Sequence, residues 1–459
     1  PLIRSTMAGA AAAAAVVSAV LLRPSVALAL LVAIVYLNLS DVLVRSFSLP
    51  SVLQLMSLPV LIAAWIHHGP GITRRILGEP LTWLLGAYAL LLLASATWAQ
   101  EPGLAQARFA EILKALLLYA LIVLLATTPE RMRIALWTMV GAGAFLGGLG
   151  VLQVTAGVGR GLAEMARVKH AHIYGDVFGP RLAGPLGDPN FFAQILLVLV
   201  PLAVFLVWGE RTRRSRRAAL LCLALILAAS LLTYSRGGAL ALAFVVPASL
   251  VAHGVRWRTI AFTGTVMALG AATLAPAGVR ERLATIGQFL PEQTVLPETD
   301  SSFQERMVLM GAAWEMMSAN PLLGVGAGNY TARFGEYADL LGSVAQDYQD
   351  PDDVRYPHNL YLEVGAETGV AGLGLFLAAL LAALLGLEKA RSGLREAGAR
   401  GGGAMARALQ ISLAGYLISS LFLHGDFERY LWLLFGMTGA LLAMARMGFG
   451  TPDAWGHEG

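Results

Sequence analysis

Long apolar segments alternate with short polar segments along almost the whole chain. Most of the apolar runs approach the roughly 20 residues that an α-helix needs to cross a bilayer. Their apolar residues are continuous, with little of the period-two alternation that marks barrel strands, so the pattern predicts helices. The runs lie near residues 7–22, 26–44, 50–66, 81–99, 109–127, 134–154, 190–208, 218–234, 237–252, 259–275, 366–388, 408–423 and 429–447.

The number of spans depends on the first two runs. Both runs are short, and only Arg23 and Pro24 separate them. We interpret them either as a tight hairpin or as one broken element. The runs therefore predict an all-α, polytopic membrane protein with twelve or thirteen spans.

Composition supports this prediction. The chain has 459 residues, of which 57% are hydrophobic and only 14% are charged, and its mean hydropathy is +0.66. Soluble globular chains carry about 25% charged residues. A soluble enzyme, a disordered chain and a disulfide-rich secreted scaffold are therefore excluded. The chain has one cysteine, Cys222, and a single cysteine excludes internal disulfides and cysteine-based metal sites. Cys222 lies in an apolar run.

Positive charge is concentrated in short loops, which predicts the orientation of the chain. Because arginine and lysine are enriched in cytoplasmic loops, these segments are predicted to face the cytoplasm. They alternate correctly with the apolar runs, so the remaining loops face outward, which is the periplasm in a Gram-negative bacterium. The positive segments are Arg74–Arg75, Arg131 with Arg133, residues 210–217, Arg256 with Arg258, and residues 389–407.

Two outer loops are long, at residues 155–189 and 276–357. The second loop contains helical spacing over residues 301–319, which Asn320 and Pro321 end. Long loops of this kind are often functional. We divide the chain accordingly into four parts: 1–154 (N-terminal spans), 155–275 (first long loop and central spans), 276–357 (periplasmic cap) and 358–459 (C-terminal spans).

Four sequence blocks on the outer side carry candidate chemistry. Each also has a simpler interpretation, such as arginine at a membrane boundary, close helix packing at glycine, or an ordinary turn. An acidic run from Asp347 to Asp353 is interpreted as a solvated loop. The blocks are Arg181 to Asn190 with Gly184 and Asp188, Tyr234-Ser235-Arg236-Gly237-Gly238, Arg306 followed by the glycine-rich Gly324 to Tyr330, and Pro357-His358-Asn359 followed by Gly365, Gly369 and Gly372.

The functional interpretation rests on the prediction that all four blocks face the same, outer side of the membrane. Arginine recognises phosphate bidentately and keeps its charge in a poorly solvated site. Histidine can exchange a proton near neutral pH. Three guanidinium groups beside one imidazole, next to lipid, suit the transfer of a glycan from a lipid-linked diphosphate to a hydroxyl. An activated lipid must carry the energy because ATP is not available outside the cytoplasmic membrane.

The same blocks resemble the O-antigen ligase and polymerase superfamily. His358-Asn359, nine residues, Gly369, two residues and Gly372 are similar to the signature of that superfamily. The blocks Arg181-x-x-Gly184 with Asp188-Pro189-Asn190, Ser235-Arg236-Gly237, and Arg306 followed by Asn320 to Gly326 also resemble it, in the same order. The resemblance implies a C-type glycosyltransferase fold with about twelve spans and both termini in the cytoplasm, which favours joining or demoting one of the first two runs.

The layout is most similar to that of the O-antigen ligases, which join O-antigen from undecaprenyl diphosphate to lipid A–core lipopolysaccharide without metal or cofactor. On this interpretation His358 is the general base, while Arg236 and Arg306, with Arg181, hold the diphosphate. A single direct displacement would invert the anomeric configuration. The remaining candidate substrate-binding residues are Asp188, Asn190, Tyr234, Asn359 and Tyr361.

Three other functions remain open. An O-antigen or exopolysaccharide polymerase uses the same donor with a glycan-lipid acceptor. A protein O-oligosaccharyltransferase transfers the glycan to serine or threonine. A small-anion transporter needs ionisable residues inside the spans, whereas most charges here fall at the ends of the apolar runs.

Overall fold

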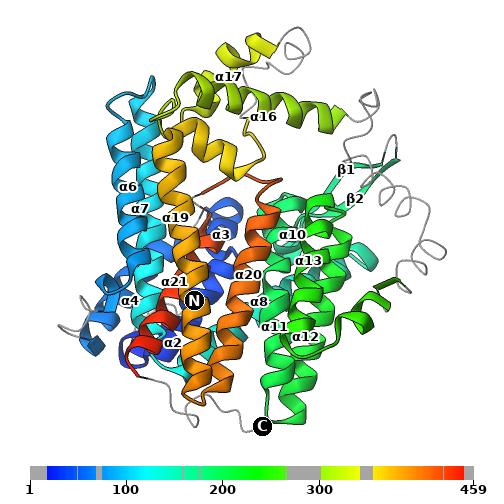
Figure 1. The fold of residues 1–459 in the computed structure, drawn as a ribbon. Coiled ribbons are helices and arrows are strands. Elements are labelled where there is room, and N and C mark those ends of the chain that lie inside the picture. Colours follow the sequence, from blue (N-terminus) through cyan, green and yellow to red (C-terminus); the bar gives the residue numbers. More distant parts are fainter. Residues whose placement is uncertain are drawn as a thin grey trace, which may run out of the picture.

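The computed structural model describes residues 18–48, 50–68, 75–157, 160–174, 177–262, 264–265, 301–341, 355–426 and 428–448. The helices of this part of the chain stand side by side in a bundle, and shorter helices lie across one end of it (Figure 1). The acidic run Asp347 to Asp353 lies outside the described residues. So do most of the apolar runs 7–22 and 259–275.

The helices follow the apolar runs closely. In the first third they are α2 (Pro24–Tyr36), α3 (Leu39–Phe47), α4 (Val52–His68), α6 (Pro80–Ser95), α7 (Pro102–Leu125), α8 (Pro129–Thr155) and α9 (Arg160–Ala163). In the middle they are α10 (Pro189–Leu197), α11 (Leu199–Gly209), α12 (Arg213–Leu232) and α13 (Arg236–Ala252). In the last third they are α16 (Ser301–Ala319), α17 (Tyr330–Ala338), α19 (Leu360–Glu396), α20 (Arg400–Ser419) and α21 (Arg429–Arg446).

Several of these helices begin at a proline, as at Pro80, Pro102 and Pro129. Proline suits the first helical turn because its fixed φ is helical and its missing N–H has no intrahelical partner there. The run 26–44 is broken instead: α2 and α3 meet at a bend of 57°. Asn38 lies at the bend with a left-handed φ of 51°, which asparagine tolerates better than most residues.

The prediction of a helical membrane protein is confirmed. The described residues contain four helices that are long and apolar enough to cross a membrane, or five if the bent pair α2–α3 counts as one span. Val52–His67, Pro80–Ser95 and Arg236–Ala252 are apolar but shorter. The count of twelve spans stays a prediction.

The fold departs from the all-α prediction in one place. Residues 168–182 of the first long loop form an antiparallel hairpin of β1 (Val168–Tyr174) and β2 (Val177–Leu182), in which Lys169 pairs with Arg181. The hairpin lies at one end of the bundle (Figure 1), where β2 contacts α8, α10 and α12. Strand edges are tolerated outside lipid because water can satisfy their backbone groups. The described residues also contain the short 3-10 turns η1 (Glu164–Ala166), η2 (Gly184–Leu186) and η4 (Asp339–Leu341).

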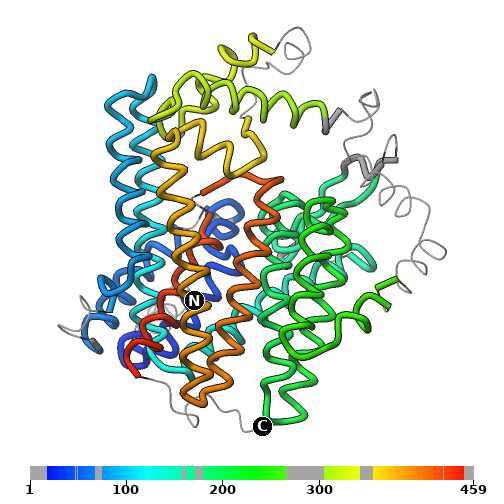
Figure 2. Tube along the Cα trace, in the orientation of Figure 1, coloured from blue at the N-terminus to red at the C-terminus, as the bar shows by residue number. Residues whose placement is uncertain are grey.

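The helix α16, predicted from the spacing of residues 301–319, forms the cap together with α17. In Figure 2 the yellow-green cap lies against the gold beginning of α19. Between the two cap helices, residues 321–326 bind α19 through the backbone: Val325 N donates to Ala366 O at 2.9 Å and Val370 N to Pro321 O at 2.8 Å. Gly369 allows this approach, because its φ is 60° and a Cβ there would lie 2.4 Å from the backbone of Leu322.

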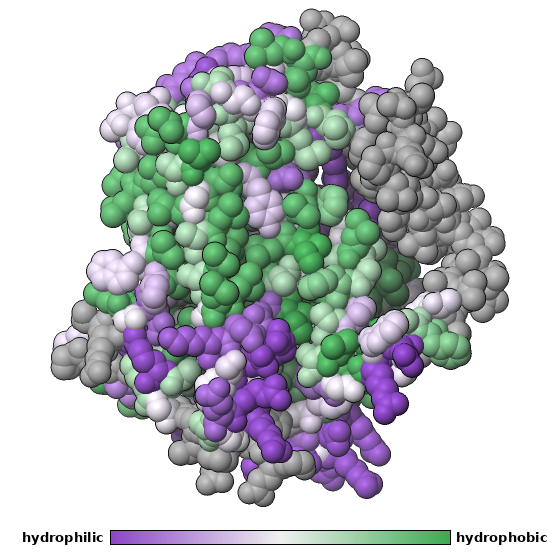
Figure 3. Space-filling view, in the orientation of Figure 1, coloured by the Kyte–Doolittle hydropathy of each residue, from purple (hydrophilic) through white to green (hydrophobic). Residues whose placement is uncertain are grey.

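Charged side chains gather at the end of the bundle opposite the cap. Figure 3 shows an apolar band across the middle of the molecule and hydrophilic side chains at its lower end. At that end Arg133 pairs with Glu210 at 2.5 Å, and Arg75 donates to Thr127 O at 3.3 Å. These contacts join the loops near 75, 131–133 and 210, which were predicted to share one side of the membrane.

Candidate functional site

The first two sequence blocks are joined by Arg181. This residue lies near the end of β2, where its Nε donates to Thr233 O at 3.1 Å and its Nη2 to Asn190 Oδ1 at 3.3 Å. Thr233 immediately precedes Tyr234. The guanidinium therefore fastens the turn before α13 to the first turn of α10.

Two residues of the sequence blocks begin helices at this end. Asp188 caps α10, because its Oδ1 accepts hydrogen bonds from Asn190 N at 2.7 Å and Phe191 N at 3.1 Å. Ser235 caps α13 by accepting from Gly238 N at 3.2 Å. Tyr234, with a left-handed φ of 49°, lies in the turn before α13. Arg236 is the first residue of α13.

His358 and Asn359 begin α19. The Oδ1 of Asn359 accepts from Tyr361 N and Leu362 N at 3.0 Å each, and its Nδ2 donates to Leu421 O at 3.2 Å. Tyr361 is also engaged, since its hydroxyl donates to Leu417 O at 2.9 Å. Both side chains thus fasten the start of α19 to the end of α20, and they can position His358 by doing so.

Arg306 acts electrostatically on both Arg181 and His358, and Arg236 acts on Arg181. The pKa of Arg181 is lowered to about 10, chiefly by burial and also by the positive charges of Arg306 and Arg236, against the opposing effect of Asp188. Burial also lowers the pKa of His358 to about 3, with Arg306 as the next cause. A site that disfavours further positive charge in this way is suited to an anionic ligand.

The glycine-rich segment from Gly324 to Tyr330 does not form a phosphate-binding loop. Its backbone amides are already occupied: Val325 N and Gly326 N bind carbonyls of α19, and Gly328 N donates to the Oε2 of Glu367 at 2.7 Å. The segment is a turn that packs on α19, because a Cβ at Gly324 would lie 2.4 Å from the Glu367 backbone.

Sequence reasoning missed His424, which lies on the connector between α20 and α21. Its ring contacts the ring of His358 with centroids 5.2 Å apart, stacks on Tyr356 at 4.2 Å, and meets Phe191 edge-on at 5.1 Å. Burial lowers the pKa of His424 to about 3, with Arg108 as the next cause. A histidine after an apolar run is a weak signal, so only the folded chain reveals it.

A buried charged cluster beneath this connector was also missed. Arg108 of α7 lies 3.0 Å from Glu363, 3.7 Å from Glu367 and 3.5 Å from Asp426. Tyr88 donates a hydrogen bond to Asp426. The available signal was the pair of glutamates four residues apart, which helical geometry places on one face in the first two turns of α19.

We expect Arg108→Met to destabilise the protein by about 3–5 kcal/mol, because it leaves buried carboxylates without their cation. The readout is the midpoint of thermal unfolding in detergent. Lys114→Met is the matched control on the same helix, since its ion pair with Glu111 is exposed and such pairs contribute little. Equal midpoints for the two variants would contradict a stabilising role for the cluster.

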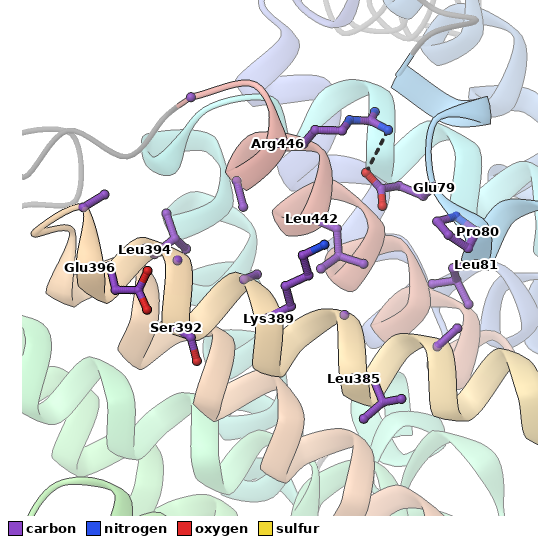
Figure 4. Close-up of a pocket in the computed structure, with 17 residues that line it drawn as sticks. Glu79, Pro80, Leu81, Leu385, Lys389, Ser392, Leu394, Glu396, Leu442 and Arg446 are labelled. Carbon is purple, nitrogen blue, oxygen red and sulfur yellow. Dashed lines mark ion pairs between the residues drawn. The ribbon is translucent and has the colours of Figure 1, made fainter.

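A separate cavity of about 1030 Å³ lies at the opposite end of α19. It is bounded by the start of α6, the second half of α19 and the end of α21, and none of the four sequence blocks lines it. Figure 4 shows Lys389 and the ion pair of Arg446 with Glu79 at its rim. At 1.5 Å per helical residue, it is roughly 40 Å from His358 along α19.

The chain was compared with known proteins. Residues 221–377 match the family model described as O-antigen ligase. No curated protein matches the chain. A chain in the solved structure "Structural coordination of polymerization and crosslinking by a peptidoglycan synthase complex" is similar at 19% identity and a TM-score of 0.40, covering 80% of this chain and 97% of that one.

The family match begins in α12 and ends in α19, so it includes Arg236, Arg306 and His358. The Arg181 block precedes the matched residues but is hydrogen-bonded to Thr233 within them. The match over residues 221–377, together with the four blocks, supports an assignment to the O-antigen ligase and polymerase superfamily.

Proposed function

We propose that this protein is an O-antigen ligase that transfers a glycan from undecaprenyl diphosphate to a hydroxyl of lipid A–core lipopolysaccharide. The observation that carries the proposal is that Arg306 acts electrostatically on both His358 and Arg181, while Arg236 acts on Arg181. The family match supports a transferase of this kind. The acceptor and the donor lipid are the parts that need a direct test.

In the proposed reaction the acceptor hydroxyl attacks the anomeric carbon of the donor glycan. A bond forms between the acceptor oxygen and that carbon, while the bond from the carbon to the diphosphate oxygen breaks. His358 takes the hydroxyl proton, and the diphosphate leaves with its lipid. Arg181, Arg236 and Arg306 stabilise the negative charge that develops on the leaving group. One displacement inverts the anomeric configuration.

In this proposal the other predicted site residues hold the arginines and His358 in place. Asp188 and Asn359 start the helices that carry the site, Asn190 holds Arg181, and Tyr361 fastens α19 to α20. Tyr234 sets the turn before Arg236. Metal independence stays a prediction.

The proposal places the site on the periplasmic face of the inner membrane, with twelve spans and both termini in the cytoplasm. The arginine-rich loops support this orientation, because they gather at the end opposite the cap. The proposal also retains the division of the chain into four parts, of which the last contains His358. The parts are 1–154, 155–275, 276–357 and 358–459.

Binding of the donor should raise the pKa of His358 and so make its imidazole a stronger base. Without donor, burial and Arg306 hold the pKa of His358 near 3, so the imidazole is neutral across the physiological range. A diphosphate offsets the arginine charges and raises this pKa again. We therefore expect kcat/KM for the donor, which reports the free enzyme, to stay level from about pH 7.5 to about pH 5. An acid limb near the ordinary histidine pKa of about 6.5 would contradict this.

The deciding experiment offers purified protein undecaprenyl-diphosphate glycan with one of three acceptors. These are rough lipopolysaccharide, a second lipid-linked glycan, and a serine-containing pilin-like peptide. We expect modification of the lipopolysaccharide alone, seen as a ladder on a gel. Growth of the lipid-linked glycan would identify a polymerase instead, and modification of the peptide an oligosaccharyltransferase.

A further inference from the structure

The orientation of the His358 ring has an unusual basis. A catalytic imidazole is generally held by a hydrogen bond to its second ring nitrogen, as in carboxylate–histidine pairs. Among the described residues, the Nδ1 atom of His358 is buried and has no hydrogen-bond partner. Its backbone has a left-handed φ of 46°, which fixes where the side chain leaves the chain but not how the ring turns.

The ring of His424 packs directly against the ring of His358. The two rings meet edge to face, with centroids 5.2 Å apart and an angle of 71° between their planes. His424 is itself held on two more sides, because it stacks on Tyr356 at an interplanar angle of 8° and meets Phe191 at 89°. Aromatic pairs at these separations have preferred geometries, so they restrict rotation of the rings.

The connector that carries His424 is fastened independently of these rings. Gly425 N donates to the Oε2 of Glu363 at 2.6 Å, and Trp432 Nε1 donates to the carbonyl of Asp426 at 2.8 Å. Asp426 also pairs with Arg108 at 3.5 Å. A ring mounted on this buried framework can hold a neighbour in place, whereas a ring on a loose loop cannot.

We propose that His424 is a positioning residue, which holds the imidazole of His358 in its working orientation through ring packing. This inference rests on the proposed function, because it assigns His424 a role in the same transfer. Phe191 extends the contact to the first turn of α10, directly after Asn190, so His424 also relates the base to the Arg181 block.

The test compares His424→Ala and His424→Phe with wild-type protein in the transfer assay. Alanine removes the ring, and a displacement of about 1 Å at a reacting group costs roughly 10²-fold in rate. We expect kcat to fall by about that factor, while the donor KM stays unchanged because the arginines still hold the diphosphate. Phenylalanine keeps the ring and its packing, so it should restore most of the lost kcat and should fold even if alanine does not.

The matched control is His253→Ala. His253 likewise contacts an aromatic ring, that of Trp208 at 5.1 Å, but it follows α13 at the end away from the site. It should leave kcat unchanged. Normal kcat in His424→Ala, or a loss in His424→Phe as large as in His424→Ala, would overturn the positioning role. Absence of transfer by wild-type protein would overturn the proposed function, and this inference with it.

Discussion

His358→Ala is expected to lower kcat for glycan transfer by about 10²–10⁴-fold, because the acceptor hydroxyl loses its general base. The donor KM should change little, since the arginines that hold the diphosphate are separate side chains. The measurement is the rate of lipopolysaccharide modification by purified protein at saturating donor. This is the largest effect expected for any single substitution in the chain.

A second variant separates catalysis from folding. Position 358 has a φ of 46°, a region in which asparagine is better tolerated than most residues. His358→Asn should therefore fold at least as well as His358→Ala and be equally inactive. Thermal unfolding in detergent checks that both variants are folded. Transfer by either variant at the wild-type rate would remove His358 from the proposed reaction.

The local parts of this molecule were predictable from the sequence. In the described residues helices form along the apolar runs, and their boundaries are marked by residues within one turn, such as Pro80, Pro102 and Asp188. The helix over residues 301–319 was recognisable from spacing alone. The family motifs were recognisable for the same reason, because each is a short stretch with a specific backbone or side-chain requirement.

The contacts between distant segments were not predictable. Arg108 and Glu363 are 255 positions apart, and nothing local to either indicates the other. The glycine-rich segment after Asn320 illustrates the same limit. Its residues are compatible with an ordinary turn, but nothing in them indicates that its amides bind carbonyls and the carboxylate of Glu367 from α19. Which partner a backbone amide finds is decided by the packing of whole helices.

The hairpin at residues 168–182 shows a third limit. Continuous apolar runs identify helices in lipid, but a segment outside lipid can form strands or turns with little hydrophobic pattern. Arg181 is positioned by this hairpin and by its hydrogen bond to Thr233, so the location of this predicted site residue depends on an element that was not expected.

Replacing arginine by lysine at 181, 236 or 306 should lower kcat/KM by roughly 10²-fold each. This is about the loss expected when an enzyme loses one hydrogen-bond donor to the negative charge that develops in the transition state. Lysine keeps the charge but not the planar pair of donors. Arg181 shows the difference directly, because it uses Nε for Thr233 and Nη2 for Asn190 at the same time. A lysine ammonium cannot span both acceptors, so Arg181→Lys should also loosen the turn before α13.

The pH dependence of Arg181→Lys distinguishes this loss of geometry from a loss of charge. Burial and the neighbouring arginines lower the pKa at this position, and the same causes would lower a lysine pKa from its ordinary value of about 10.4. A lowered pKa means that charge is lost as pH rises, so the deficit should grow between about pH 7 and about pH 9. Arg333→Lys is the control on the cap, where Arg333 pairs with the exposed Glu336. If lysine is tolerated at all three site positions, simple charge attraction is sufficient and the bidentate grip is not required.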